Sequence, residues 1–174
     1  MSALTRQLTP ADAAAYQSLR LRGLQDSPNS FSASYADEAG RTLAEVEARL
    51  LPVADGSRCV FGAFESGSLA GFLAFVRPER DKLRHWAELA GLYVVPGSRR
   101  RGIGGALIDA AISHARLLPG LRQLKLGVNA DNLAARLLYV SRGFHCVGVH
   151  PEALFVDGRF YDEEFYVLPL SRET

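Results

Sequence analysis

The sequence contains few of the residues that mark several common classes of protein. Only two of its 174 residues are cysteines, Cys59 and Cys146, and their separation matches neither a CxxC motif nor a pair of metal ligands. The four histidines include no HExxH pattern, so a metal site has no support. The formal net charge is only +1, which gives no global attraction to nucleic acid or to a membrane surface. Any anion-binding site must therefore be local.

Long apolar runs are missing as well. No stretch approaches the roughly 20 apolar residues that a membrane-spanning helix needs, and residues 1–6 are too polar for a signal peptide. We therefore expect a cytoplasmic protein that does not bind membrane. In that reducing compartment we expect two free thiols, although sequence alone leaves a disulfide open. The length fits one domain, so we expect residues 1–174 to form a single domain.

The hydrophobic pattern predicts seven strands and four helices. The strands are expected over 4–8, 59–64, 69–76, 86–95, 121–128, 144–150 and 160–168, and the helices over 10–24, 42–50, 102–116 and 131–142. Residues 31–40 are small and polar and predict a loop or a frayed turn. Thr42 followed by Glu45 predicts a capping box at the start of the second helix. Ser66-Gly67 and Asp157-Gly158 predict hairpin turns. Consecutive strands favour antiparallel pairing, and the later strand–helix–strand steps favour parallel pairing. The expected fold is α/β (α+β mixed), with a mostly antiparallel sheet of about seven strands flanked by about four helices.

One segment of the chain carries a recognisable chemistry. A strand ends near Pro96, three arginines follow at 99–101, and Gly102-Ile103-Gly104-Gly105 opens a helix. A helix N-terminus offers unpaired N–H groups and positive potential, and glycines let an anion approach those groups. The segment therefore predicts a phosphate site. A Walker loop is excluded because no lysine is present, and a dinucleotide fingerprint would need a third glycine where Leu107 stands.

Two motifs in the right order point to one family. The first is Arg99-Arg-Arg-Gly102-Ile-Gly104, which fits the pattern Arg/Gln-x-x-Gly-x-Gly/Ala. The second is Asn132-Leu-Ala-Ala-Arg-Leu-Leu-Tyr139, followed by Gly143-Phe144. With these motifs the sequence resembles the GNAT superfamily of N-acetyltransferases. The resemblance extends from Cys59 to the C-terminus and is weakest before that residue.

The resemblance implies an acyltransferase that uses acetyl-CoA as co-substrate and needs no metal. It implies transfer of the acetyl group to a primary amine by direct attack in a ternary complex, with a backbone N–H stabilising the oxyanion. The residues that it places against coenzyme A are Leu92, Val94, Val95, Arg99, Arg100, Arg101, Gly102, Ile103, Gly104, Gly105, Asn132, Ala135 and Tyr139. Gly91 could permit a bulge that separates its strand from the next parallel strand. Asn132 could also be a helix cap.

Two residues are candidates for catalysis. By resemblance, the Tyr139 hydroxyl protonates the leaving thiolate; the alternative is an aromatic core residue. Glu88 precedes Arg99 at the distance of the general-base glutamate in histone-type members, and it could accept the amine proton. The alternatives are a glutamate that faces solvent or pairs with Arg84, and a water chain in place of a carboxylate base. A covalent cysteine intermediate has no supporting motif.

The acceptor is poorly specified by the sequence. It is a small-molecule amine or an amine of a peptide or protein, and its walls are expected at 30–35, 80–86 and 156–164. The acidic residues Asp157, Asp162, Glu163 and Glu164 could attract a cationic amine or could form a solvated hairpin rim. Homodimers are common among relatives, so a homodimer stays open.

Two functions of other classes stay open. One is a sensor module that binds acetyl-CoA without turnover, which intact Tyr139 and Glu88 disfavour. The other is nucleic-acid binding through Arg99 to Arg101, Arg116, Arg122 and Lys125. The near-neutral net charge and the lack of a recognition motif disfavour it, so we expect no nucleic-acid partner.

Overall fold

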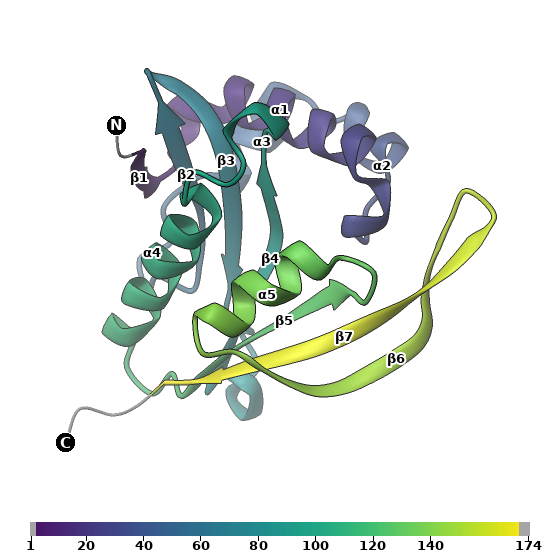
Figure 1. Cartoon of the computed structure of the whole chain (residues 1–174). Helices are drawn as coiled ribbons and strands as arrows, with labels where there is room; N and C mark the ends of the chain where they lie inside the picture. Colours follow the sequence, from purple (N-terminus) through teal and green to yellow (C-terminus); the bar gives the residue numbers. More distant parts are fainter. Residues whose placement is uncertain (1–2, 171–174) are drawn as a thin grey trace.

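The computed structural model describes residues 3–170 as one seven-stranded sheet with helices on both faces (Figure 1). The strands are β1 (Leu4–Gln7), β2 (Arg58–Glu65), β3 (Ser68–Val76), β4 (Trp86–Val94), β5 (Gln123–Asn129), β6 (His145–Val156) and β7 (Arg159–Pro169). They lie in the order β1-β2-β3-β4-β5-β7-β6. Only β4 and β5 pair in parallel, and every other neighbouring pair is antiparallel. The predicted mixed, mostly antiparallel sheet is confirmed.

The helices form two groups that cover opposite faces of the sheet (Figure 1). On one face lie α1 (Ala13–Asp26), α2 (Tyr35–Ala39) and α3 (Leu43–Arg49); on the other lie α4 (Ile103–Leu117) and α5 (Leu133–Ser141). Side chains alternate along a strand, so each strand contributes to two cores. On β3, buried Phe72 packs in the core with α1 and α3, and buried Leu73 packs in the core with α4.

Several elements form where the sequence predicts them because local side chains favour them. The Thr42 hydroxyl accepts a hydrogen bond from the Glu45 N–H (3.3 Å), and the Glu45 carboxylate accepts one from the Thr42 N–H (2.7 Å), so the expected capping box begins α3. The hairpin turns at Ser66-Gly67 and Asp157-Gly158 have positive φ at both residues (49° and 81°; 49° and 79°), as the tightest hairpin turns require.

Two N-terminal elements differ from expectation. The first helix begins later, because Pro10–Asp12 form a 3-10 turn before α1 starts at Ala13. Residues 31–40 are not only loop, because α2 forms within them. Its N-cap Ser34 accepts a hydrogen bond from the Asp37 N–H (3.2 Å), and Asp37 accepts one from the Ser34 N–H (2.7 Å).

The strands β4 and β5 separate halfway along their length. They pair only from Trp86 to Glu88 against residues 123–125. On the other edge of β4, Phe72 pairs with Tyr93 and Ala74 with Ala90, so β4 holds one more residue than β3 over this interval. That bulge lies at Gly91, whose φ is +65°. The predicted bulge at Gly91 and the predicted separation of the strands are confirmed.

The described residues include two free thiols but neither a candidate metal site nor a candidate membrane span. Residues 3–170 contain no group of three or more His, Cys, Asp or Glu side chains that could hold a metal ion. Both cysteines are free thiols, and burial raises the pKa of the Cys59 thiol to about 12, which keeps it protonated at neutral pH. Within the same residues, no helix has the length and apolar character needed to cross a membrane.

Candidate active site

Two cavities lie beside the separated ends of β4 and β5. The α4 cavity has a volume of about 690 Å³ and lies at the N-terminus of α4. The sheet cavity has a volume of about 360 Å³ and is lined by parts of β2, β3, β4 and β5 together with Glu163 from β7. Asn29, Ser30 and Phe31 line both cavities, so this short loop lies where the two meet.

The α4 cavity has the features of an anion site. The N-cap of α4 is Gly102, with φ at +81°, and a Cβ atom there would meet nothing within 4 Å, so the approach to the helix end is open. The first N–H groups of a helix have no partner within it, which leaves those of residues 103–105 for a ligand. A Cβ atom on Gly104 would lie 2.9 Å from Leu138 Cδ2, so a side chain there would press on α5.

The three arginines before α4 have different positions. Arg99 donates from Nε to the Val94 carbonyl (2.9 Å) and lines the α4 cavity with Arg100, whose φ is +61°. Arg101 instead pairs with Glu65 (3.5 Å) and is not among the residues that line either cavity. Glu65 also accepts a hydrogen bond from the Ser98 hydroxyl, so β2 fixes the turn that precedes α4.

Most of the residues expected against the cofactor line the α4 cavity. They are Leu92, Val94, Arg99, Arg100, Gly102, Ile103, Gly104, Gly105, Asn132 and Ala135. Arg101, Val95 and Tyr139 are not among the lining residues of the described chain. The Val95 N–H is already engaged with the Ala70 carbonyl (2.9 Å).

In the second motif, Asn132 lies at the wall of the α4 cavity, whereas Tyr139 is buried in the core. Asn132 caps α5, because its Oδ1 accepts a hydrogen bond from the Ala135 N–H (3.1 Å), and it also lines the cavity. Tyr139 is only 6% exposed and packs against Phe144 and Tyr166. Burial raises the pKa of the Tyr139 hydroxyl well above its ordinary value. The Tyr139 hydroxyl therefore stays protonated at neutral pH.

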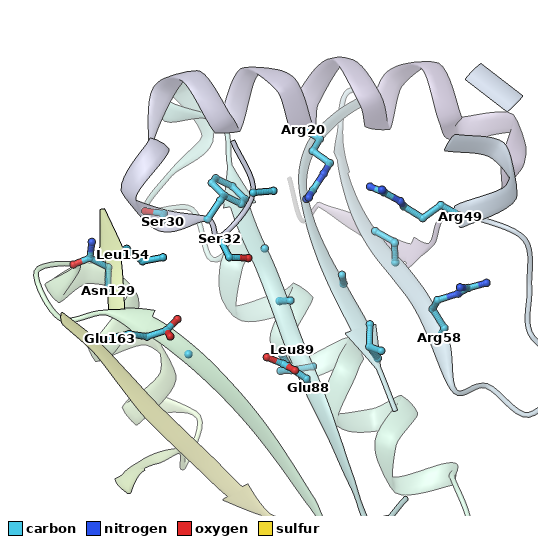
Figure 2. Close-up of a pocket in the computed structure, with 18 of the residues that line it drawn as sticks. Arg20, Ser30, Ser32, Arg49, Arg58, Glu88, Leu89, Asn129, Leu154 and Glu163 are labelled. Atoms are coloured by element: carbon cyan, nitrogen blue, oxygen red, sulfur yellow. The ribbon is translucent and has the colours of Figure 1, made fainter. Parts of the chain in front are cut away.

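The sheet cavity brings together two carboxylates, Glu88 on β4 and Glu163 on β7 (Figure 2). Glu88 stands at the last paired position before β4 leaves β5. Within the described chain it forms no salt bridge, and Arg84 pairs instead with Asp55 (3.0 Å). Burial raises the pKa of Glu163, the charge of Glu88 raises it further, and His150 opposes the shift.

The other acidic residues of the hairpin lie outside the cavity. Asp157 belongs to the turn, and Asp162 accepts a hydrogen bond from the Glu152 N–H (2.9 Å). Glu164 pairs with Arg136 (2.8 Å). Of the four, Glu163 alone lines the sheet cavity. Of the expected acceptor walls, residues 30–33 and Glu163 line it, while residues 80–86 do not.

The structure adds residues that the sequence did not single out. Asn129, only 4% exposed, donates from Nδ2 to the Asn29 carbonyl (2.9 Å) and fixes the shared loop to the end of β5. Arg20, Arg49 and Arg58 line the sheet cavity from three separate elements (Figure 2). The arginines are far apart in the sequence, and no motif signals their convergence.

Comparison with known proteins gives a consistent result. Residues 22–144 match the model of the acetyltransferase (GNAT) family. A 79-residue segment is 34% identical to a phosphinothricin N-acetyltransferase from Streptomyces coelicolor and covers 45% of this chain and 46% of that protein. Matches to the curated relatives span between 20% and 46% of their lengths.

Solved structures match over nearly the whole chain. A GNAT-family acetyltransferase from Streptococcus pneumoniae has a TM-score of 0.85 and 25% identity, with 97% of this chain and 99% of that chain covered. The Salmonella typhimurium protein yncA, determined with its cofactor acetyl-CoA, has a TM-score of 0.82 and 25% identity, covering 100% and 97%.

Proposed function

The chain belongs to the acetyltransferase (GNAT) family, and from this premise we propose that it transfers the acetyl group of acetyl-CoA to the primary amine of a small molecule. The α4 cavity would bind acetyl-CoA and the sheet cavity would bind the amine. The observation that carries this proposal is the meeting of the two cavities at residues 29–31, beside the separated strands. Two substrates held there can react directly, without a covalent enzyme intermediate.

The residues of the α4 cavity fit coenzyme A. Its pyrophosphate needs N–H donors, positive charge and room for close approach, which the open end of α4 and Arg100 offer. The separated edge of β4 leaves backbone groups that do not pair with β5, and these can hydrogen-bond an extended arm. When bound, acetyl-CoA supplies an activated thioester.

The carboxylates of the sheet cavity would prepare the amine. An ammonium ion has no lone pair, so it must lose a proton before its nitrogen can bond to the acetyl carbon. We assign Glu88 as the acceptor of that proton, directly or through water, and Glu163 as the second carboxylate that holds the cationic amine. Tyr139, a buried phenol on α5, is assigned to deliver a proton to the departing thiolate.

We propose that residues 1–174 form one domain, since the two cores share a single sheet, and that the protein acts in the cytoplasm. We propose a small-molecule acceptor over a protein because the sheet cavity measures only about 360 Å³. A homodimer stays a prediction.

Mass spectrometry of amine panels incubated with acetyl-CoA tests this function. Wild type should yield acetylated amine and free thiol in equal amounts. Glu88→Gln should lower the rate about 100-fold near neutral pH, less so as the pH rises and free amine becomes abundant. Gln has nearly the size of Glu, so the loss would report the charge. Retained acetyl-CoA binding with no product from any amine would favour the sensor function instead.

A further inference from the structure

The sheet cavity carries more positive charge on one side than its surroundings neutralise. Arg20 of α1, Arg49 at the end of α3 and Arg58 at the start of β2 lie on one side of it, and Glu163 lies on the other (Figure 2). Glu88 lies on β4 between them (Figure 2). The cavity is therefore dipolar, with carboxylates toward β7 and guanidinium groups toward β2.

A buried carboxylate holds two of these guanidinium groups in place. Glu38 of α2 is only 3% exposed and pairs with Arg20 (3.2 Å), Arg49 (3.2 Å) and Arg41 (3.0 Å). One carboxylate cannot neutralise three guanidinium ions. Arg20 and Arg49 line the cavity, whereas Glu38 and Arg41 do not. Two positively charged residues thus form part of the cavity wall, while the carboxylate that pairs with both is not part of it.

Two of the guanidinium groups have N–H donors without a hydrogen-bond partner in the described chain. Arg20 Nε is buried and has no hydrogen-bond partner in the described chain, which is uncommon for a buried polar atom. Arg20 Nη1 reaches the bulge of β4, where a Cβ atom on Gly91 would lie 3.6 Å from it. Arg58 forms no ion pair with any residue of 3–170, although it lines the cavity. Guanidinium donors arranged around a cavity are well suited to bind an oxyanion.

We propose that the acceptor is a zwitterionic, amino-acid-like molecule whose anionic group binds Arg20, Arg49 and Arg58. Its amine then lies at Glu88 and Glu163, on the side where the acetyl group arrives. This inference rests on the proposed function, because it names the acceptor class of the same site. A diamine or polyamine would place a second cation against the arginines, and an alkylamine would leave them without a partner.

The acceptor class is tested with three matched series of amines. The probes are ω-amino carboxylates of two to six carbons, alkylamines of the same lengths and diamines of the same lengths. At the best length, the amino carboxylate should exceed its matching alkylamine at least about tenfold in kcat/KM, because the alkylamine lacks the group that would form charge-assisted hydrogen bonds with the arginines. Equal or better turnover of alkylamines or diamines at every length would overturn the proposal.

Three variants separate the anion site from the fold. Arg49→Met and Arg58→Met should lower kcat/KM for the best amino carboxylate about tenfold or more, and should lower it much less for the alkylamine of that length. Arg41→Met is the matched control, because Arg41 also pairs with Glu38 but does not line the cavity. It should leave both probes within about twofold of wild type. An equal loss in Arg41→Met and Arg49→Met would contradict the proposal.

A binding measurement keeps this test independent of turnover. Isothermal titration of the protein with the best amino carboxylate, or with the whole carboxylate series if none is acetylated, should show binding that Arg58→Met weakens about tenfold or more. Such binding without acetyl transfer would leave the anion site standing and defeat the proposed function. Acetyl transfer to alkylamines without binding of any amino carboxylate would support the proposed function and overturn the proposed anion site.

Discussion

The carboxylate of Glu163 lies over Gly127 of the neighbouring strand, in the space that a larger residue at 127 would need. A Cβ atom on Gly127 would stand 2.8 Å from Glu163 Cδ. The residue paired with Glu163 in register is Asn129, so the Glu163 side chain reaches diagonally across the two strands. The glycine lets Glu163 lean into the sheet cavity.

Gly127→Ala should therefore displace Glu163 from the acceptor site. We expect kcat/KM for the amine to fall about tenfold, with the Kd for acetyl-CoA unchanged, because only the sheet cavity is altered. Steady-state kinetics and calorimetry measure the two quantities. Gly148→Ala is the control, since a Cβ atom there meets nothing within 4 Å. Equal losses in the two variants would refute a specific role for Gly127.

Glu163→Gln should lower the activity and raise the stability of the protein. The gain in stability should depend on pH. The pKa of Glu163 is raised in the folded protein, first by burial and then by Glu88. Ionised Glu163 therefore costs stability above its raised pKa, and the cost disappears below the ordinary value of 4.5, where folded and unfolded chains are both protonated. We expect Tm of the variant to exceed wild type by roughly 1–3 °C near neutral pH. A gain that persists near pH 4 would contradict this origin.

Glu38→Gln should destabilise the protein and change its response to acid. Burial opposes ionisation of Glu38, but the hydrogen bonds and charges of Arg20 and Arg49 outweigh burial and lower its pKa to about 2. The stabilisation is complete above the ordinary value of 4.5 and is lost as the pH falls toward 2. Urea unfolding near pH 7 should show a loss of about 3 kcal/mol, shrinking below pH 4.5. A constant difference down to pH 2 would show that the ion pairs are not its cause.

Tyr139→Phe should separate the chemistry of the hydroxyl from the packing of the ring. The ring packs in the core, and the hydroxyl forms no hydrogen bond with the described residues, so Tm should change little. If the hydroxyl donates a proton to the thiolate, kcat should fall about 10- to 100-fold with unchanged affinity for acetyl-CoA. Unchanged kcat would leave Tyr139 a core residue only.

The parts of the fold that depend on nearby residues are predictable from sequence. The capping box at Thr42, the two hairpin turns and the bulge at Gly91 each depend on residues a few positions apart, and all are confirmed. The same holds for the glycine-opened helix after Arg101. Local hydrogen-bonding and steric rules suffice at these places.

The acceptor side depends on contacts that no local rule reveals. Glu38 lies in a segment whose composition predicts a polar loop. In the structure it pairs with Arg20, Arg41 and Arg49. Asn129 fixes Asn29, 100 residues away. The position of Arg101 is decided by Glu65, an acid 36 residues before it. These relationships exist only once the sheet has formed.

Calorimetric titration with acetyl-CoA tests the central claim most directly. Wild type and Gly148→Asp should both bind acetyl-CoA with saturation, because residue 148 lies outside both cavities. Gly104→Asp should bind at least about tenfold more weakly, since it adds a negative charge and a side chain at the N-terminus of α4. Absence of binding by wild type at millimolar acetyl-CoA, or equal binding by all three proteins, would contradict the account.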